Sequence, residues 1–431
     1  MLYRTHQQGI IEVAKAIRVA AVYPATVLSY TVPGGGKSWL PPLLLREFPD
    51  DWRIGWFVPR LSLRYQGARD AMDNFKLGLR ETGNAQDPCR GNRGFVSTHQ
   101  SLTSNRQLWQ QEFDRHPYIV FIDEFHHAHI ERKDAKPNNL ASVLDQIQCK
   151  VLVLATGTLE TGNGDLIWGV HYSPGENKGE YVPDFEKTCD HRVRYSRADA
   201  LNENALVPLQ FEHHDGPVEW RYLSSGLDDG CRLSEATRDQ ESNAVFTALE
   251  TDFADGLLKD GVKHWKRYGF IGRKRSKLLV VATNQSKSRL YHERLNDEFP
   301  GRAFLALSDN KEAHDDIKRF KKTEGAILVT CQMAYEGLDD KDLTHGICLT
   351  NIRSKPRIEQ FFGRLWRAKE GKKTAWCFVP DDPRMGRVVD KIKVEKDAVL
   401  KAHKEVPPPP PRFGIAATSG ETTAAQARRD V

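Results

Sequence analysis

The string TVPGGGKS at residues 31–38 combines residue types that can hold a phosphate group. A plain turn needs one glycine or occasionally two, whereas this segment has three in a row before Lys37 and Ser38. A β-prone stretch precedes it and an apolar stretch (43–48) follows, which predicts the order strand, glycine loop and helix. Such a loop points backbone N–H groups at a phosphate, and the helix N-terminus adds positive potential. We interpret Lys37 as the cation for the β- and γ-phosphates and the Ser38 hydroxyl as a ligand of Mg²⁺.

The glycine string departs from the strict phosphate-loop pattern in two ways. Thr31 stands where that pattern has glycine. Pro41 and Pro42 fall early in the expected helix, which they should kink or shorten. For this string taken alone, a loop without a ligand remains the alternative.

Two carboxylates end a buried strand about 85 residues further on. The run YIVFIDEFHHAH (118–129) is continuously apolar up to Asp123 and Glu124, as expected for a buried parallel strand. An acidic residue at such a strand end, beside a phosphate loop, is where a partner of Mg²⁺ belongs. We predict that Asp123 holds the metal and that Glu124 orients and deprotonates the attacking water, the alternative being two ordinary helix-start acids. The histidines that follow lack the i, i+4 spacing and the third acidic ligand of a zinc site, so no zinc site is predicted.

In this order the motifs resemble the superfamily 2 helicase and translocase ATPases, which are P-loop NTPases with a DEAD/DEAH-type box. The resemblance spans about residues 1–380 and is nearest to the branch of restriction-enzyme motors and repair helicases. It implies an α/β fold of two tandem RecA-like domains, each a doubly wound parallel sheet, with ATP in the cleft between them. It also implies ATP and Mg²⁺ as cofactors and a nucleic-acid partner, with DNA favoured over RNA.

The resemblance assigns further roles in the first half of the chain. YRTHQQGI is similar to a segment in which a glutamine reads the adenine edge, which implies nucleotide contacts at Gln7 and Arg4. WFVPRLSLRYQ resembles motif Ia, GFVSTHQSL a second segment that grips the nucleic-acid backbone, and VLVLATGTLE motif III. The implied residues are Pro33, Gly34, Gly35, Gly36, Lys37 and Ser38 around the phosphates, Pro59, Arg60, Thr98 and Gln100 on the nucleic acid, and His126, Thr156 and Thr158 in coupling.

A second set of motifs begins after residue 275. KLLVVATNQSKSRLYHERL resembles motif IV, AILVTCQMAYEGLDD motif V, and PRIEQFFGRLWR matches the Q-x-x-G-R-x-x-R of motif VI. Arg364 and Arg367 should lie on one helix face and aim together at a triphosphate, where such arginines accelerate hydrolysis about 10³–10⁵-fold. Read in isolation, GRLWR is a basic turn on a solvated helix face. The other implied residues are Thr283, Asn284 and Thr330 on the nucleic acid, and Gly337, Asp339 and Gln360 on the nucleotide.

The motif positions predict the domain organisation. Residues 1–195 form the first RecA-like domain, 196–245 a connector with an accessory β element, and 246–382 the second RecA-like domain. Residues 383–405 read as one charged helix, and 406–431 as a Pro-rich linker and weakly ordered tail that could dock a protein partner. The expected strands lie near 25–30, 52–58, 94–98, 118–122 and 150–155, and near 278–283, 303–307, 326–330, 346–350 and 374–379.

The segment DGVKHWKRYGFIGRKRSK (260–277) is not assigned by these motifs. It interleaves basic residues with Trp265 and Tyr268, a combination that suits phosphate contact with base stacking. A solvated basic helix leading into the second domain explains the same composition equally well.

Composition limits the class of protein. The 431 residues are 28% charged and 39% hydrophobic, as in soluble globular proteins, and no apolar run approaches the roughly 18 residues that span a bilayer. Basic residues exceed acidic ones by 63 − 58 = 5, which allows a polyanionic partner without demanding one. Seven scattered cysteines and a start without a signal-peptide pattern fit a cytoplasmic protein that has no membrane partner.

These observations favour an ATP-dependent helicase or translocase that moves along or unwinds DNA. The alternative is the motor subunit of a restriction, defence or repair complex, which translocates duplex DNA while a partner chain carries the nuclease. In PDFEK (183–187) the acids and the lysine are too close for a nuclease site in this chain. Intact Lys37, Glu124, Arg364 and Arg367 disfavour a scaffold with a decayed ATPase, and a small-molecule kinase would not need the second lobe.

Overall fold

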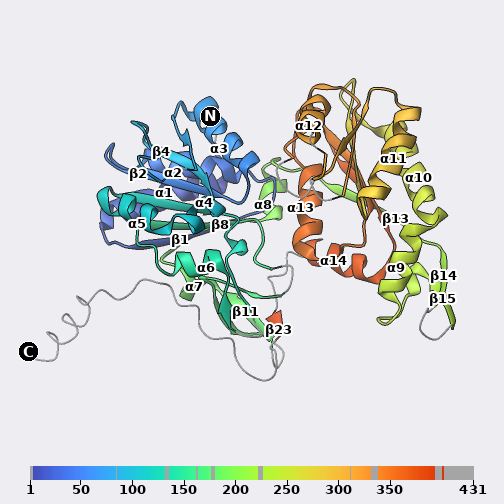
Figure 1. The fold of residues 1–431 in the computed structure, drawn as a ribbon, viewed down its shortest axis with the longest axis horizontal. Helices are drawn as coiled ribbons and strands as arrows, with labels where there is room; N and C mark the ends of the chain where they lie inside the picture. The colour runs from blue at the N-terminus through green and yellow to red at the C-terminus, as the bar shows by residue number, and fades with distance from the viewer. Residues whose placement is uncertain are drawn as a thin grey trace, which may run out of the picture. The chain divides into compact units, whose positions relative to one another are not determined.

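The computed structural model describes residues 3–83, 85–131, 135–161, 164–175, 180–221, 227–310, 312–331, 338–393 and 400–401. The chain divides into two compact units (Figure 1). Unit 1 comprises Met1–Val32, Gly36–Ser196 and Asp397–Val431, and unit 2 comprises Pro33–Gly35 and Arg197–Lys396. Each unit has its own parallel sheet, as expected for tandem RecA-like domains.

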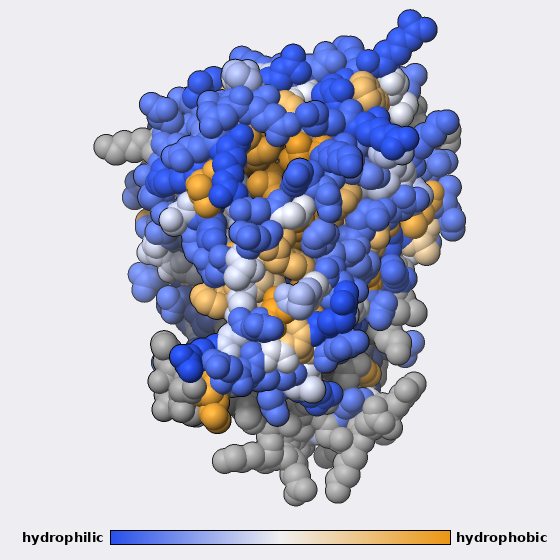
Figure 2. All heavy atoms as spheres, turned by 90° about the vertical axis from the view of Figure 1, so that its right-hand side faces the viewer, coloured by the Kyte–Doolittle hydropathy of each residue, from blue (hydrophilic) through white to orange (hydrophobic). Residues whose placement is uncertain are grey.

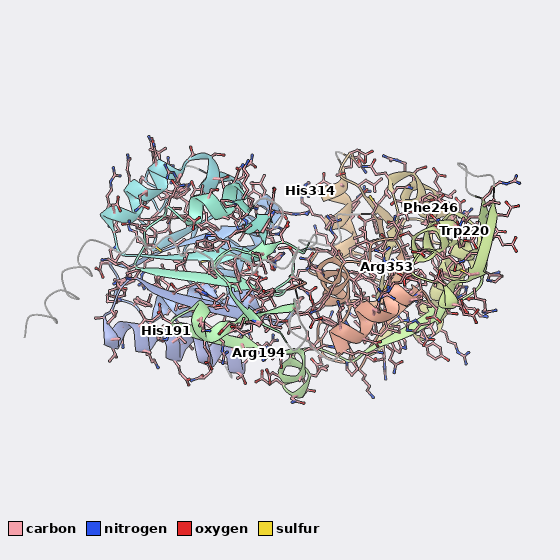
Figure 3. The ribbon with its side chains drawn as sticks, turned by 90° about the horizontal axis from the view of Figure 1, so that it is seen from below. His191, Arg194, Trp220, Phe246, His314 and Arg353 are labelled. Carbon is pink, nitrogen blue, oxygen red and sulfur yellow. The ribbon has the colours of Figure 1, made fainter. Side chains whose placement is uncertain are left out.

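Unit 1 contains a seven-stranded parallel sheet in the order β12-β1-β8-β5-β2-β4-β3. The five predicted strands are confirmed. Their apolar runs are buried, as expected for a sheet that is covered on both faces. The edge strand HRVRY was not predicted; it alternates, with Val193 and Tyr195 buried and Arg192 and Arg194 exposed. His191 and Arg194 of this strand are labelled in Figure 3. The strands are β1 Ala25–Thr31, β2 Arg53–Val58, β3 Arg80–Glu81, β4 Gly94–Thr98, β5 Tyr118–Asp123, β8 Val151–Thr156 and β12 His191–Tyr195.

Helices pack on both faces of this sheet, which makes it doubly wound. One core cluster combines Ile10, Leu40 and Ala68 from α1, α2 and α3 with side chains of the strands. Another combines Leu102, Trp109 and Leu140 from α4, α5 and α6 with the strands. The helices are α1 Thr5–Ala20, α2 Leu40–Arg46, α3 Leu61–Phe75, α4 His99–Ser104, α5 Arg106–Arg115, α6 Asn139–Leu144 and α7 Phe185–Thr188.

Unit 2 contains a six-stranded parallel sheet in the order β13-β22-β21-β18-β20-β19. The five strands predicted for the second domain are all present. The sheet has one more strand than expected, because β13 pairs in parallel with β22 although it lies in the segment 196–245 that we expected to be a connector. The strands are β13 Leu209–His214, β18 Lys277–Ala282, β19 Ala303–Ala306, β20 Ile327–Thr330, β21 Leu343–Leu349 and β22 Ala375–Pro380.

Helices also pack on the sheet of unit 2, and Leu257, Trp265 and Tyr291 join the strands in one core cluster. The prediction of one charged helix over 383–405 is wrong in its extent. The helix α14 covers Pro383–Lys393, and Leu400–Lys401 forms a short strand, β23, because its backbone pairs with Glu180–Tyr181 of β11. The other helices are α8 Arg197–Asn202, α9 Glu241–Glu250, α10 Asp252–Tyr268, α11 Gln285–Glu298, α12 Ala313–Lys322 and α13 Lys355–Leu365.

Both units also contain short sheets of two or three strands. They comprise β10 His171–Pro174 with β11 Glu180–Asp184, β6 His129–Glu131 with β7 Lys136–Pro137 and β9 Leu166–Ile167, the hairpin β14 Pro217–Arg221 with β15 Asp228–Arg232, and the hairpin β16 Phe270–Ile271 with β17 Lys274–Arg275. None of the helices in the described ranges combines the length and apolar character needed to cross a bilayer. The predicted Pro-rich linker and tail (406–431) lie outside the described residues.

Candidate nucleotide site

The glycine loop follows the carboxyl end of β1 directly. Gly34 and Gly36 have φ of +84° and +96°, a backbone conformation that glycine adopts without strain. A 3₁₀ turn, Lys37–Trp39, comes next, and α2 then begins at Leu40. Pro41 and Pro42 lie in the first turn of α2, where a missing N–H costs little, so they start a short helix rather than kink a longer one.

Lys37 lies between the two predicted carboxylates. Its Nζ atom is 2.7 Å from Asp123 Oδ1 and 2.5 Å from Glu124 Oε1. The three side chains are only 14%, 11% and 23% exposed, so solvent screens their charges weakly. Asp123 ends β5 and Glu124 follows it, so parallel strands place both acids at the sheet edge where the glycine loop leaves β1.

The three groups control one another's protonation. Burial alone would lower the pKa of Lys37, but the two carboxylates raise it above its usual value. Burial would likewise raise the pKa of Glu124, yet Lys37 and a hydrogen bond with His126 hold that pKa well below its usual range. For Asp123, burial prevails over Lys37 and the pKa is raised. Lys37 therefore favours the ionised form of Glu124 more than burial opposes it.

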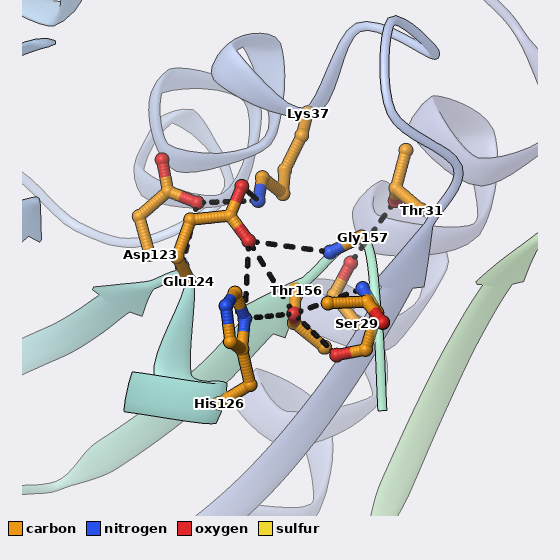
Figure 4. Close-up of polar contacts among 9 residues, drawn as sticks. Ser29, Thr31, Lys37, Asp123, Glu124, His126, Thr156 and Gly157 are labelled. Carbon is orange, nitrogen blue, oxygen red and sulfur yellow. Dashed lines mark hydrogen bonds and ion pairs between the residues drawn. The ribbon is translucent and has the colours of Figure 1, made fainter. Parts of the chain in front are cut away.

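Glu124 connects this ion cluster to the loop after β8 (Figure 4). Its Oε2 atom lies 3.4 Å from His126 Nδ1, 3.4 Å from Thr156 Oγ1 and 3.5 Å from the backbone N of Gly157. His126 Nδ1 and Thr156 Oγ1 are 2.8 Å apart, and Thr156 Oγ1 donates to the carbonyl of Thr158 at 2.7 Å. The structure thus brings together the three residues expected to couple the nucleotide to the rest of the motor.

The residues expected at the adenine edge also lie beside the glycine loop. Gln7 is 4% exposed, and its Oε1 atom accepts a hydrogen bond from the backbone N of Arg4 at the start of α1. A Cβ atom built on Gly36 would lie 2.9 Å from Arg4 Nη1 and 3.4 Å from Gln7 Nε2. A side chain at this position would displace the end of the Arg4 side chain, and the φ of +96° would strain its backbone.

The nucleic-acid candidates of unit 1 follow the next strands along the same sheet edge. Pro59 and the exposed Arg60 come directly after β2, and Arg60 is the residue before α3. Thr98 ends β4, and its buried hydroxyl accepts from the backbone N of Ser101 at 3.2 Å, while Gln100 is exposed. Since β5, β2 and β4 are neighbours, these candidates extend from the ion cluster along one edge.

In unit 2, the candidates of motifs IV and V lie at the ends of adjacent strands. Thr283 and Asn284 follow β18, and the Asn284 side chain begins α11 by accepting from Lys287 N at 2.9 Å. Thr330 ends the neighbouring strand β20 and is fully buried. The predicted nucleotide contact Gly337 lies outside the described residues.

The prediction that Arg364 and Arg367 share one helix face is wrong. The helix α13 ends at Leu365, and Arg367 lies beyond its cap in a bridge with Leu206. Both guanidinium groups still reach the motif V segment. Arg364 Nη1 donates to the carbonyl of Leu338 at 3.0 Å, and Arg367 forms an ion pair with Asp339. Burial would raise the pKa of Asp339, but Arg367 lowers it below its usual value.

Several partners of motifs V and VI were not predicted from the sequence. Lys277 forms a buried ion pair with Asp340 at 2.7 Å, and Lys369 pairs with Asp342. Lys372 is 7% exposed, and its Nζ atom donates to the carbonyl oxygens of Leu343, Leu365 and Arg367 at 2.5, 2.5 and 2.9 Å. Gln360 is half-buried on α13 and lies one helical turn before Arg364.

The donor set of unit 1 fits a nucleotide with a divalent cation. Glycines of positive φ, a lysine and the Ser38 hydroxyl suit a polyphosphate, while hydroxyl and carboxylate oxygens are the ligands that Mg²⁺ prefers. The histidines after Glu124 have separate partners instead. His126 bonds to Thr156, whereas His129 Nδ1 is 3.0 Å from Asn138 Nδ2. Within the described ranges, no group of three or more His, Cys, Asp or Glu side chains could hold a metal ion.

The site and the fold resemble those of superfamily 2 helicase-like ATPases, and comparison with known families agrees for the first unit. Residues 4–161 match the family model described as "Type III restriction enzyme, res subunit". The expected resemblance to restriction-enzyme motors is thereby confirmed for the first unit.

Curated relatives extend the similarity along the chain. An uncharacterized protein of Mycobacterium tuberculosis (strain CDC 1551 / Oshkosh) is 24% identical over 404 residues, which cover 90% of this chain and 64% of the relative. The chain thus spans somewhat less than two thirds of that relative's length. The ATP-dependent DNA helicase MPH1 of Debaryomyces hansenii is 27% identical over 164 residues, covering 32% of this chain and 15% of the helicase.

Solved structures share the fold at low identity. The ATP-dependent Type ISP restriction-modification enzyme LlaBIII, bound to DNA, has a TM-score of 0.55 at 16% identity, over 88% of this chain and 28% of that enzyme. A fragment assigned to the HsdR subunit of a type I restriction enzyme from Vibrio vulnificus YJ016 has a TM-score of 0.54 at 15% identity, over 90% of this chain and 65% of that one.

Proposed function

We propose that this chain is an ATP-dependent nucleic-acid motor that hydrolyses ATP to move along or unwind DNA, with RNA as a less favoured track. The observation that carries the proposal is the cluster of Lys37, Asp123 and Glu124 at the edge of the first sheet, hydrogen-bonded onward to Thr156 and Gly157. A phosphate-binding lysine held by two acids of a D-E-x-H box matches what ATP hydrolysis requires. The cysteine pattern supports a cytoplasmic location.

In this proposal, the residues of unit 1 bind the nucleotide and activate water. Gln7 and Arg4 would contact the base, residues 33–38 the phosphates, and Ser38 and Asp123 the Mg²⁺ ion. Bound Mg²⁺ would neutralise charge on the phosphates. If Lys37 turns from Glu124 to a phosphate, Glu124 loses one of the two contacts that lower its pKa, and burial would then make it a stronger base.

Arg364 and Arg367 would stabilise the charge that develops on the transferred phosphoryl group, and Asp339 and Gln360 would assist them. Arg367 is ion-paired to Asp339 in this structure, so it must exchange a carboxylate for a phosphate. Guanidinium groups pair with either anion in the same forked geometry, which makes the exchange feasible.

The decisive test is Glu124→Gln, which keeps the shape of the side chain and removes the base. We expect ATP binding within about threefold of the unmodified chain and hydrolysis at least about a hundredfold slower. Steady-state hydrolysis should be measured alone and with single-stranded, duplex and forked DNA and RNA at fixed salt, with the exposed Glu131→Gln as control. Turnover of Glu124→Gln close to that of the control would refute the assignment.

A second candidate function is the motor subunit of a restriction, defence or repair complex that translocates duplex DNA without separating the strands. The family model of residues 4–161 and the two restriction enzymes of similar fold support it, and these proteins extend beyond the part that this chain matches. A protein partner could dock on the tail (406–431). Displacement of a third strand from a triplex, without unwinding of a forked duplex, would favour this candidate over a helicase.

A further inference from the structure

The end of α10 and the hairpin β16–β17 form a basic surface with exposed aromatic rings. Tyr268 and Phe270 are 45% and 42% exposed and lie two residues apart along the chain. Trp265, which the sequence offered as a stacking platform, is instead fully buried, and its Nε1 atom donates to the carbonyl of Ser276 at 3.1 Å. The rings available to a ligand are therefore Tyr268 and Phe270.

The cations beside these rings are exposed and mostly unneutralised. In the described part of the chain, Lys263, Arg267, Arg273 and Lys274 have no carboxylate within ion-pair distance. Lys266 is different, because it pairs with Glu298 at 2.8 Å. Lys263 and Arg267 are four residues apart on α10 and so share a face, and the Arg267 guanidinium lies 5.0 Å from the Tyr268 ring centre.

Arg275 belongs to the scaffold of this surface. Its Nη1 atom donates to the carbonyl of Lys266 at 2.9 Å, and its guanidinium lies 4.5 Å from the Phe270 ring centre. Its backbone N donates to the exposed Glu324 at 3.0 Å, so one carboxylate also borders this surface. The hairpin is thus fixed to the end of α10 while its tip projects two cations.

The loop after motif VI adds to the same surface. Gly371 has a φ of +80°, and a Cβ built on it would lie 3.2 Å from Gly272 N at the hairpin tip. Lys373 in this loop is exposed, and it too lacks a carboxylate partner among the described residues; Lys369 pairs with Asp342. Two segments about 100 residues apart therefore gather five uncompensated cations around two rings. Figure 2 shows the face of unit 2 that lies at the right of Figure 1, where small hydrophobic areas lie within a hydrophilic surface.

We propose that this surface binds a single nucleic-acid strand, through phosphate contacts from the five cations and base stacking on Tyr268 and Phe270. Phosphate groups bind Lys and Arg side chains whose charge is not already neutralised by a carboxylate. Exposed bases stack on aromatic rings regardless of the base sequence. An acidic peptide would use the cations but would not need two exposed rings, and a membrane surface would need a larger apolar face.

The surface is separate from the contacts expected at motifs IV and V. Thr283 and Asn284 follow the carboxyl end of β18, whereas the hairpin precedes its amino end at Lys277. A six-residue strand is about 20 Å long, so a strand of nucleic acid on the hairpin occupies a different part of unit 2. The inference rests on the proposed nucleic-acid motor, but binding can be measured without ATP.

The test measures binding of a 20-nucleotide oligothymidylate and of a duplex of equal length to the nucleotide-free full chain by fluorescence anisotropy. Arg273→Glu with Lys274→Glu should weaken single-strand binding at least about tenfold and reduce the slope of log affinity against log salt by about 1.4, near 0.7 per lost phosphate contact. Tyr268→Ala with Phe270→Ala should weaken binding at least about fivefold and leave the salt slope unchanged.

Matched controls distinguish a loss of affinity at this site from an effect of net charge and from an effect of unfolding. Lys15→Glu with Lys391→Glu, at two exposed positions, makes the same change in formal charge, +5 − 4 = +1, and should bind as the unmodified chain does. Phe246→Ala removes a 57%-exposed ring from α9, at the labelled position in Figure 3, and should have no effect. Melting temperatures should agree for all variants.

Several outcomes would overturn the inference. Unchanged single-strand affinity in both test variants would do so, as would an equal loss in the control variants. So would binding of anionic lipid vesicles or an oligoglutamate that the same substitutions abolish, with oligonucleotide binding intact. Failure of the proposed function gives a different pattern, because a chain without ATP hydrolysis would still lose oligonucleotide affinity on Arg273→Glu with Lys274→Glu.

Discussion

The two units hold charged clusters of different composition at the positions expected to meet a nucleotide. In unit 1, Lys37 lies between the carboxylates of Asp123 and Glu124. In the described part of unit 2, Arg364 donates to the carbonyl of Leu338 and Arg367 forms an ion pair with Asp339. In the proposed motor, the first cluster would hold the divalent cation and the second would contact a phosphate.

The two clusters also differ in how readily their charges can move. Lys37 contacts both carboxylates directly. The three groups shift one another's pKa, so their protonation is coupled. Arg367 has one carboxylate partner and is otherwise held through backbone atoms, with its Nε donating to the carbonyl of Gly363 at 3.2 Å. We therefore expect the loss of one charged group in unit 1 to alter the protonation of the other two, and the loss of Arg367 in unit 2 to slow hydrolysis without such an effect.

The largest effect is predicted for Arg367→Ala. If Arg367 stabilises the transition state, hydrolysis should slow about a thousandfold while the affinity for ATP changes less than about threefold. Arg357→Ala, at an exposed position on the preceding helix α13, is the matched control and should hydrolyse normally. Single-turnover rates and ATP titrations measure the two quantities. A rate for Arg367→Ala within tenfold of the control would mean that the Arg367–Asp339 pair has a structural role and no role in catalysis.

Lys372 provides the next test, because it ties Arg367 to α13 and β21 through three carbonyl oxygens. Lys372→Met removes those hydrogen bonds and should lower the free energy of unfolding by about 2–4 kcal/mol and slow hydrolysis about tenfold or more. The control is Lys277→Met, which removes the other buried lysine of this region and breaks its ion pair with Asp340. Urea unfolding should show a cost for both variants, whereas only Lys372→Met should reduce the turnover number at saturating ATP. Equal turnover in the two variants would contradict a role for Lys372 in placing Arg367.

Sequence reasoning succeeded where local pattern determines structure and failed where distant partners decide. Continuous apolar runs marked the central strands, and a glycine loop before Lys37 marked the turn that β1 must make. The strand β13 was missed because its register depends on β22, more than 160 residues later. Arg367 was placed on a helix, since nothing in GRLWR reveals that pairing with Leu206 ends α13 first. In the string EGKKT, Lys372 has the appearance of a solvated lysine. In the fold, it is buried and surrounded by carbonyl oxygens.

A smaller effect is predicted for Thr156→Val, which tests the connection between Glu124 and the loop after β8. Valine keeps the shape and removes the hydroxyl that bonds to His126 and Thr158, a loss of about 1–1.5 kcal/mol. We expect nucleic-acid-stimulated hydrolysis to fall about tenfold and basal hydrolysis to fall less than threefold. Thr26→Val, at a buried position near the start of the neighbouring strand β1, is the control. An equal fall in both activities would mean that Thr156 supports Glu124 without coupling it to the nucleic acid.

The smallest effect concerns a buried base beside the acidic cluster. His99 is 8% exposed, and burial lowers its pKa to about 4, although hydrogen bonds with the backbone of Asp123 and Phe57 oppose the shift. Because the unfolded chain protonates this histidine near pH 6.5, the unfolded state binds more protons below that pH and stability must fall as the solution is acidified. Between pH 6.5 and 5.5 the loss from one such group is about 1 kcal/mol.

His99→Gln should remove that part of the pH dependence, whatever it does to stability at neutral pH. Urea unfolding of the variant from pH 7 to pH 5 should therefore show a shallower fall than the unmodified chain. The exposed His314→Gln in unit 2, at the labelled position in Figure 3, should leave the slope unchanged. Parallel pH profiles for all three proteins would mean that His99 titrates normally in the folded chain. The edge of the first sheet would then be more accessible to water than its burial implies, and the cluster of Lys37, Asp123 and Glu124 would be screened accordingly.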